Sequence, residues 1–112
     1  FKGTIRGGKQ PHFEAADGTR LPLASAPANS DGRSATYGIR PEHLVLGGKL
    51  KARVAVIEPT GAETQVLASL AGQKIVAVFR ERVATLPGET LAVDPDLAKV
   101  HLFDAESGQR LD

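Results

Sequence analysis

Two glutamates that flank a glycine are the clearest candidates for chemistry in this chain of 112 residues. Glu58 and Glu63 lie on either side of Gly61 in one expected turn, where two carboxylates could act as a general acid and a general base. The alternative is that both side chains point into solvent at a loop tip. No serine lies in a nucleophile-elbow pattern, and the sequence contains no cysteine. The sequence therefore predicts no catalytic residue, and the solvent-exposed interpretation is favoured.

The three histidines are the next candidates, because imidazole is a common zinc ligand. His12, His43 and His101 fall in different expected elements, and no two of them have the i, i+4 spacing of a helical zinc site. Isolated histidines in a β-rich chain are more often surface or edge residues than ligands. The sequence thus predicts no metal site. The glycine-rich phosphate loop G-x-x-x-x-G-K-[ST] does not occur either, so no nucleotide-hydrolysing part is expected in this chain.

Short alternating segments separated by turn residues must position these side chains. Asp17-Gly18 predicts a tight hairpin, and Ala71-Gly72 predicts a second one. Gly47-Gly48 is expected to break the chain, and Asp94 is expected to cap a short helical turn. The expected strands cover residues 1–6, 12–15, 19–23, 35–40, 50–58, 62–70, 74–79, 90–93 and 99–103. About nine short strands without a long helix predict an all-β fold, best matched by a Greek-key barrel of the oligonucleotide/oligosaccharide-binding (OB-like) type.

The run from Gly38 to Leu44 joins one of these strands to a forced turn. Apolar side chains occupy every second position in residues 35–39, which is the pattern of a half-buried strand. Pro41 has no N–H and biases Arg40 toward extended geometry, so the strand should end at Arg40 and Pro41 should open a single helical turn. From these mechanics alone, Arg40 and Glu42 would pair at the surface, an interaction worth at most about 1 kcal/mol.

Composition excludes several classes of function. The net charge of +1 provides no long-range field for nucleic acid or anionic lipid, and 41% hydrophobic with 24% charged residues is typical of a soluble globular domain. No apolar stretch approaches the roughly 18 residues needed to span a bilayer. The absence of cysteine fits a reducing cytoplasm. Because the chain has no methionine and opens on Phe1 in apparent strand material, we expect a single-domain fragment of a longer protein.

The five aromatic residues decide against nucleic-acid binding, which needs exposed stacking platforms beside a basic groove. Each of them sits in an apolar strand pattern that predicts a core position: Phe1, Phe13, Tyr37, Phe79 and Phe103. Sugar-binding and oxyanion-binding modules use related barrels. A small-ligand-sensing barrel for a sugar or an oxyanion therefore stays open as an alternative.

Three runs of the sequence occur in the order of one known family. GIRPEH at residues 38–43 is the specific motif, and VIEPTGAET at 56–64 and VHLFD at 100–104 with GQRL at 108–111 support it. Together they resemble the C-terminal regulatory domain (TOBE/MOP-like, OB-like) of the ATP-binding subunits of sugar ABC importers of the maltose, trehalose and glycerol-3-phosphate type. The resemblance runs from Phe1 to Leu111 and implies the same OB-like barrel.

This resemblance implies a regulatory and dimerisation domain, residues 1–112, that acts through protein contacts and is itself no enzyme. ATP and Mg²⁺ would be used by an ATPase domain absent from this chain, which would need no cofactor of its own. The implied partners are that ATPase domain, a second copy of the subunit and membrane-spanning permease subunits, without nucleic acid or direct membrane insertion. The implied location is the cytoplasm, peripheral to the inner membrane. The residues carried over as regulatory contacts are Gly38, Ile39, Arg40, Pro41, Glu42, His43, Leu44, Glu58, Gly61, Glu63, Thr64, Val100, His101, Leu102 and Phe103.

Overall fold

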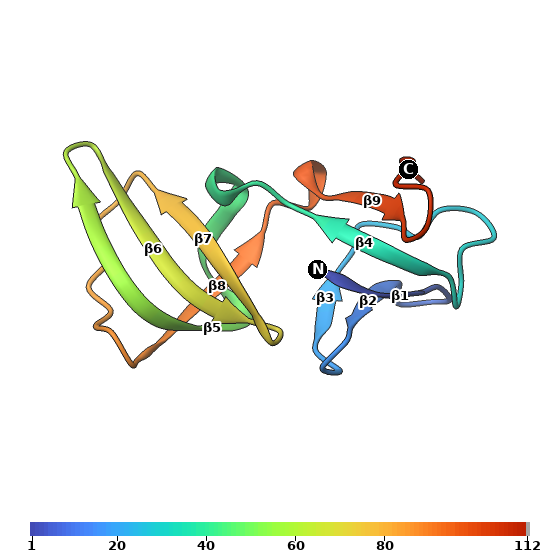
Figure 1. The fold of residues 1–112 in the computed structure, drawn as a ribbon, viewed down its shortest axis with the longest axis horizontal. Helices are drawn as coiled ribbons and strands as arrows, with labels where there is room; N and C mark the ends of the chain where they lie inside the picture. The colour runs from blue at the N-terminus through green and yellow to red at the C-terminus, as the bar shows by residue number, and fades with distance from the viewer. Residues whose placement is uncertain (112) are drawn as a thin grey trace. The chain divides into compact units, whose positions relative to one another are not determined.

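The computed structural model describes residues 1–111 and consists mainly of antiparallel strands, coloured from blue to red along the chain in Figure 1. The chain divides into two compact units, of which unit 1 comprises residues 1–39 with 97–111 and unit 2 comprises Arg40–Asp96. Within the described residues the elements are β1 (Lys2–Arg6), β2 (His12–Ala15), β3 (Arg20–Pro22), β4 (Ser34–Gly38), η1 (Pro41–His43), β5 (Leu44–Thr60), β6 (Glu63–Leu70), β7 (Gln73–Phe79), β8 (Thr90–Pro95), η2 (Leu97–Lys99) and β9 (His101–Asp104). In the described part of the chain, nine strands lie at the nine predicted segments, although β5 starts at Leu44 rather than at Leu50 and β4 ends at Gly38 rather than at Arg40. Both η elements are single 3-10 turns.

Unit 1 is built on a five-stranded sheet with the order β3-β2-β1-β4-β9. The predicted Asp17-Gly18 hairpin joins β2 to β3. Gly18 has a φ of 90°, and the backbone N–H of Thr19 donates to the Asp17 carboxylate at 2.9 Å. β3, which ends in Pro22, lies at the edge of the sheet, as expected for a residue that cannot donate to a ladder.

The core of unit 1 is centred on two aromatic rings. Phe13 is fully buried, Tyr37 is 2% exposed, and their ring centroids lie 5.3 Å apart. The Tyr37 hydroxyl donates to the Pro22 carbonyl oxygen at 2.8 Å, which satisfies the phenol inside the core. The predicted core positions of these two residues are therefore confirmed, whereas Phe1 and Phe103 are only half-buried.

Unit 2 is built on a four-stranded sheet with the order β7-β6-β5-β8. The long strand β5 pairs with β8 along its first half and with β6 along its second half. The predicted β6–β7 hairpin is confirmed, and Ala71 in its turn has a φ of 51°. The inward face of β6 carries Thr64, Val66, Ala68 and Leu70, all of which are buried.

The expected chain break at Gly47-Gly48 is wrong, because β5 runs through it. The two glycines have φ values of 83° and 120°, and the register with β8 shifts between Leu46 and Leu50, so the pair forms an irregularity inside the strand. Asp94 supports it from β8 by accepting a hydrogen bond from the Lys49 N–H at 3.2 Å. The predicted helix-capping role of Asp94 is therefore also wrong.

A second irregularity changes which side chains of β5 are buried. The register with β6 shifts between Val54 and Val56. Val54 is 2% exposed, whereas Val56, which simple alternation placed on the same inward face, is 41% exposed. A one-residue shift turns the following side chains to the other face of the sheet.

We expect Asp104 to make unit 1 sensitive to acid. Its carboxylate accepts hydrogen bonds from the Ser107 N–H at 2.9 Å and from the Arg33 guanidinium at 3.0 Å, and these lower its pKa from 3.8 to about 2. As the pH falls, Asp104 becomes protonated in the unfolded chain before it does so in the folded chain. The contribution of its carboxylate to the stability of the folded state is therefore complete above a pH of about 4 and is lost as the pH falls to about 2.

The measurement is the urea midpoint of the parent chain and of Asp104→Asn as a function of pH. The midpoints should differ at neutral pH and converge in acid. A difference that persists below pH 2 would contradict the assigned pKa.

Candidate functional site

The Arg-Pro-Glu-His corner has the predicted geometry. Arg40 is extended, with φ −82° and ψ 153°, and Pro41 occupies the first position of η1. The turn closes where the His43 N–H donates to the Arg40 carbonyl oxygen at 3.0 Å. Strand β4 ends at Gly38, two residues before the predicted end at Arg40. The surface pair expected between Arg40 and Glu42 does not form in the described part of the chain.

His43 ends this turn as a structural residue. Its carbonyl oxygen accepts a hydrogen bond from the Asp96 N–H at 2.8 Å, which ties the corner to the end of unit 2. Its ring Nδ1 is buried and has no hydrogen-bond partner within residues 1–111. A buried polar atom without a partner is unfavourable for folding.

One cavity of unit 2 brings two of the predicted motifs together. It has a volume of about 470 Å³ and is lined by η1, the start of β5, the first residue of β6, and the end of β7 with the residues after it. We call this cavity the acidic groove. Its lining residues are Glu42, Leu44, Val45, Glu63, Val78, Phe79, Arg80 and Glu81.

The β6–β7 register and the packing of η1 explain this convergence. Thr64 pairs with Phe79, so the start of β6 lies beside the end of β7, and Glu63 reaches the same rim as Arg80. The turn η1 packs against β7 and thereby adds Glu42 to the rim. The predicted residues that the groove collects are thus Glu42, Leu44 and Glu63.

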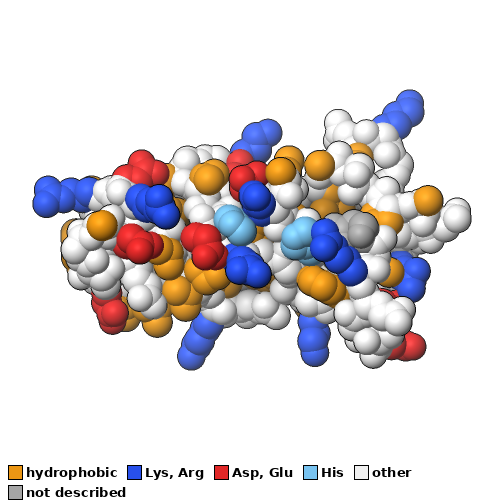
Figure 2. Space-filling model, turned by 90° about the horizontal axis from the view of Figure 1, so that it is seen from above, with side chains coloured by type: hydrophobic (Ala, Val, Ile, Leu, Met, Phe, Trp, Pro, Cys, Tyr) orange, Lys and Arg blue, Asp and Glu red, His pale blue; other side chains and the backbone are white. Residues whose placement is uncertain are grey.

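The groove combines an apolar floor with a charged rim. Leu44 and Phe79 are 5% and 3% exposed, whereas Val45 is 48% exposed. Figure 2 shows acidic side chains next to hydrophobic ones on the face of unit 2 that it presents. Within the described residues, no hydrogen bond or ion pair engages the side chains of the rim, which are Glu42, Glu63, Arg80 and Glu81.

The other predicted residues of unit 2 lie outside this cavity. Glu58 is exposed on β5, where it pairs with Gln65, so it does not share the groove with Glu63. Gly61 lies in the expected turn and has a left-handed backbone, with a φ of 68°. Thr64 is 8% exposed and faces the core. These positions shape the turn that presents Glu63.

The remaining predicted residues belong to unit 1. Val100 and Leu102 are buried, at 9% and 2% exposure, so they contribute little surface. His101 and Phe103 are half-buried. A Cβ atom at Gly38 would come within 2.9 Å of the Phe103 ring, which shows how closely that ring covers the end of β4. Ile39, the last residue of the first segment of unit 1, is half-buried.

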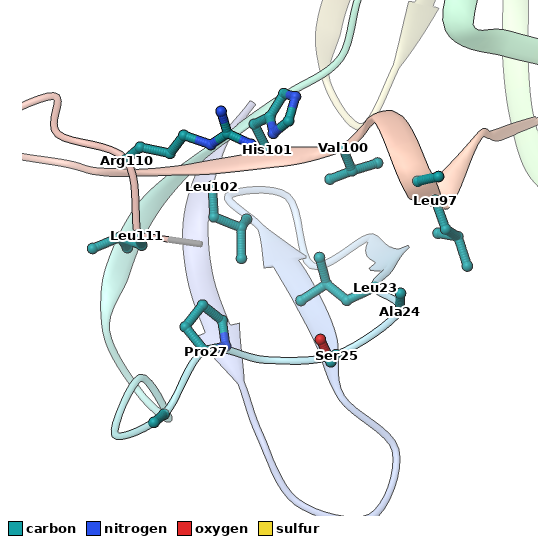
Figure 3. A pocket seen from close by; sticks show the side chains of 12 residues that line it. Leu23, Ala24, Ser25, Pro27, Leu97, Val100, His101, Leu102, Arg110 and Leu111 are labelled. Atoms are coloured by element: carbon teal, nitrogen blue, oxygen red, sulfur yellow. The ribbon is translucent and has the colours of Figure 1, made fainter.

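Unit 1 contains a separate cavity of about 510 Å³. In Figure 3, Leu23, Pro27 and Leu102 surround a common space between β9 and the segment that follows β3. Ser25 and Arg110 add polar groups to a lining that is otherwise mainly apolar.

Sequence reasoning missed more than half of the acidic groove. Val45, Val78, Phe79, Arg80 and Glu81 line it, although no motif marked them. The charged run that begins at Arg80 was the one available signal, but its proximity to Glu63 depends on the β6–β7 register and its proximity to Glu42 depends on the packing of η1 against β7. In the described residues, no group of three or more His, Cys, Asp or Glu side chains could hold a metal ion. No helix in that same part of the chain is long and apolar enough to cross a membrane.

The middle of the chain matches a known domain family. The model of the TOBE domain matches residues 37–103, which include the corner, the acidic groove and most of β9. The chain belongs to the TOBE domain family. This confirms the recognised resemblance and the all-β, OB-like fold class, to which the two antiparallel sheets conform. It also confirms that the chain corresponds to the TOBE domain, rather than to the ATP-hydrolysing domain, of ABC transporter ATP-binding proteins.

Relatives of this TOBE domain are ATP-binding proteins of transporters. An ABC transporter ATP-binding protein of Sinorhizobium fredii is 40% identical over 109 residues, covering 96% of this chain and 29% of the relative. The sn-glycerol-3-phosphate import ATP-binding protein of Chromobacterium violaceum is 39% identical over 100 residues, covering 86% and 27%. The sulfoquinovosyl glycerol transport ATP-binding protein of Agrobacterium fabrum is 37% identical over 98 residues, covering 80% and 27%. The chain thus spans less than a third of the length of each of these relatives.

Proposed function

We propose that residues 1–112 act as one C-terminal regulatory and dimerisation domain in the ATP-binding subunit of a carbohydrate or glycerol-phosphate ABC importer. The domain works through protein contacts, while ATP and Mg²⁺ are used by an ATPase domain outside this chain. Its partners are that domain, a second copy of the subunit and the membrane-spanning permease subunits. The assembled importer keeps the domain in the cytoplasm at the inner membrane.

The observation that carries this proposal is the acidic groove. It places Glu42 from the GIRPEH corner and Glu63 from the second motif in one accessible concavity. The lining offers carboxylates, one guanidinium and aliphatic side chains, but no nucleophile beside a base. Such a surface binds rather than catalyses. The names of the relatives support the importer context.

A chimera tests the proposal. This chain replaces the matching segment of the Chromobacterium violaceum glycerol-3-phosphate import ATP-binding protein, and a second variant of that protein lacks the segment. We expect the chimera to dimerise, hydrolyse ATP and support import, and the shortened protein to lose dimerisation and to hydrolyse ATP without import. Unchanged dimerisation and import after removal of the segment would contradict a regulatory and dimerisation role.

A small-ligand sensor is the second candidate function, supported by the cavity of unit 1. Its volume of about 510 Å³ lies within the range of roughly 300–1,000 Å³ common for small-molecule sites. Leu23 and Leu102 supply apolar walls, and Arg110 supplies a cationic group. Titration with maltose, sulfate or molybdate, followed by calorimetry and NMR, discriminates the two candidates. Saturable shifts at Leu23 and Leu102 would favour the sensor.

A further inference from the structure

We infer that the acidic groove of unit 2 binds an extended, positively charged segment of a partner protein. This inference rests on the proposed role in protein contacts and adds the chemistry of the partner. The charge of the rim is the first argument. Three carboxylates, those of Glu42, Glu63 and Glu81, share the lining with one guanidinium, that of Arg80. The carboxylates lack ion-pair partners in the described chain, so a cationic segment supplies the missing complement.

The floor of the groove determines what else the segment must carry. Leu44 and Phe79 form buried apolar surface, and Val45 is 48% exposed. An inorganic cation would leave the exposed Val45 side chain in water, and the described residues offer no metal-holding group. A segment with lysine or arginine and aliphatic residues satisfies both the rim and the floor, because burying the Val45 side chain is favourable.

The position of β7 favours an extended conformation for the bound segment. β7 is an edge strand of its sheet, and its last residues, Val78 and Phe79, line the groove. An edge strand presents backbone N–H and C=O groups on one side, and peptides often bind by adding a strand there. Alternating basic and aliphatic residues then direct the charges to the rim and the apolar side chains to the floor.

The experiment uses the whole chain, labelled with ¹⁵N, and a capped hexapeptide of alternating lysine and valine. A hexapeptide of alternating glutamate and valine is the comparison peptide. We expect saturable shifts of the Val45, Val78, Phe79 and Glu81 amides with the lysine peptide alone. The affinity should fall when the salt concentration rises from about 50 to about 300 mM, because the rim is exposed.

Two matched variants locate the binding. Glu42→Gln/Glu63→Gln removes two rim carboxylates, and Glu58→Gln/Glu106→Gln removes two exposed carboxylates elsewhere with the same change of net charge. The first should weaken the lysine peptide about tenfold, and the second less than about twofold. The amide spectra of both variants report whether they fold.

Several outcomes would overturn the inference. They are equal losses in the two variants, equal binding of the glutamate peptide, shifts confined to residues outside the groove, or no shift at a peptide concentration of about 1 mM. If the unmodified chain does not bind the lysine peptide but the chimera is functional, only the proposed partner chemistry is contradicted. Peptide binding together with unchanged dimerisation and import in the shortened protein, which lacks the segment, would instead contradict the proposed function.

Discussion

Gly3→Ala is expected to destabilise unit 1 by about 3 kcal/mol, because the new methyl group has no space in the sheet. Gly3 lies in β1, the central strand, and pairs with Ala15. A Cβ atom there would overlap the Glu14 carbonyl oxygen and lie 2.9 Å from the Phe13 ring. The first contact is with backbone, which cannot move away as a flexible side chain can. The overlap can be removed only if β1 and β2 move apart.

Urea unfolding followed by tyrosine fluorescence measures this effect. Tyr37 is the only tyrosine and the chain has no tryptophan, so the signal reports unit 1. The control is Gly18→Ala in the same unit, where no atom lies within 4 Å of the new methyl group. Its positive φ of 90° should cost only about 1 kcal/mol. Similar midpoints for the two variants would show that the strands accommodate the methyl group.

Tyr37→Ala is expected to remove about 3–5 kcal/mol of folding free energy, as large aromatic truncations in cores do. Tyr37 is 2% exposed and packs between Phe13 and Phe1, with ring centroids at 5.3 and 6.2 Å. Its hydroxyl also reaches the Pro22 carbonyl oxygen. Truncation therefore opens a cavity at the centre of unit 1 and also removes a hydrogen bond from its edge strand.

Tyr37→Phe separates the two contributions. It keeps the ring and removes only the donor to Pro22, so a loss of about 1–2 kcal/mol is expected. Circular dichroism must follow the unfolding, because both variants lack the fluorescent residue. A phenylalanine variant as unstable as the alanine variant would assign the stabilisation to the hydroxyl rather than to the ring.

The features predicted well from sequence depend on residues that are close together in the chain. Asp17-Gly18 adopts its turn because glycine tolerates positive φ, and Pro41 opens η1 because its ring restricts φ. Residues 62–70 were expected as one strand, and β6 covers Glu63–Leu70. Each of these outcomes is determined by the geometry of a few neighbouring residues.

The features that were missed depend on partners distant in sequence. Gly47-Gly48 indicated a chain break, yet β8 holds the strand together there through Asp94. The exposure of Val56 follows from a register shift against β6 that no alternation pattern contains. Half of the acidic groove comes from the end of β7, and only the pairing of Thr64 with Phe79 brings that end to Glu63. Tertiary pairing, rather than local propensity, decided these three features.

The division of the chain into one continuous and one discontinuous unit has a consequence during synthesis on the ribosome. All strands of unit 2 lie within Arg40–Asp96, so every pairing of its sheet is available once Asp96 has emerged. The sheet of unit 1 still lacks β9 at that moment, because β4 pairs with a strand that is translated after unit 2. Unit 2 can therefore complete its sheet, including the acidic groove, during synthesis before β4 of unit 1 can pair with β9.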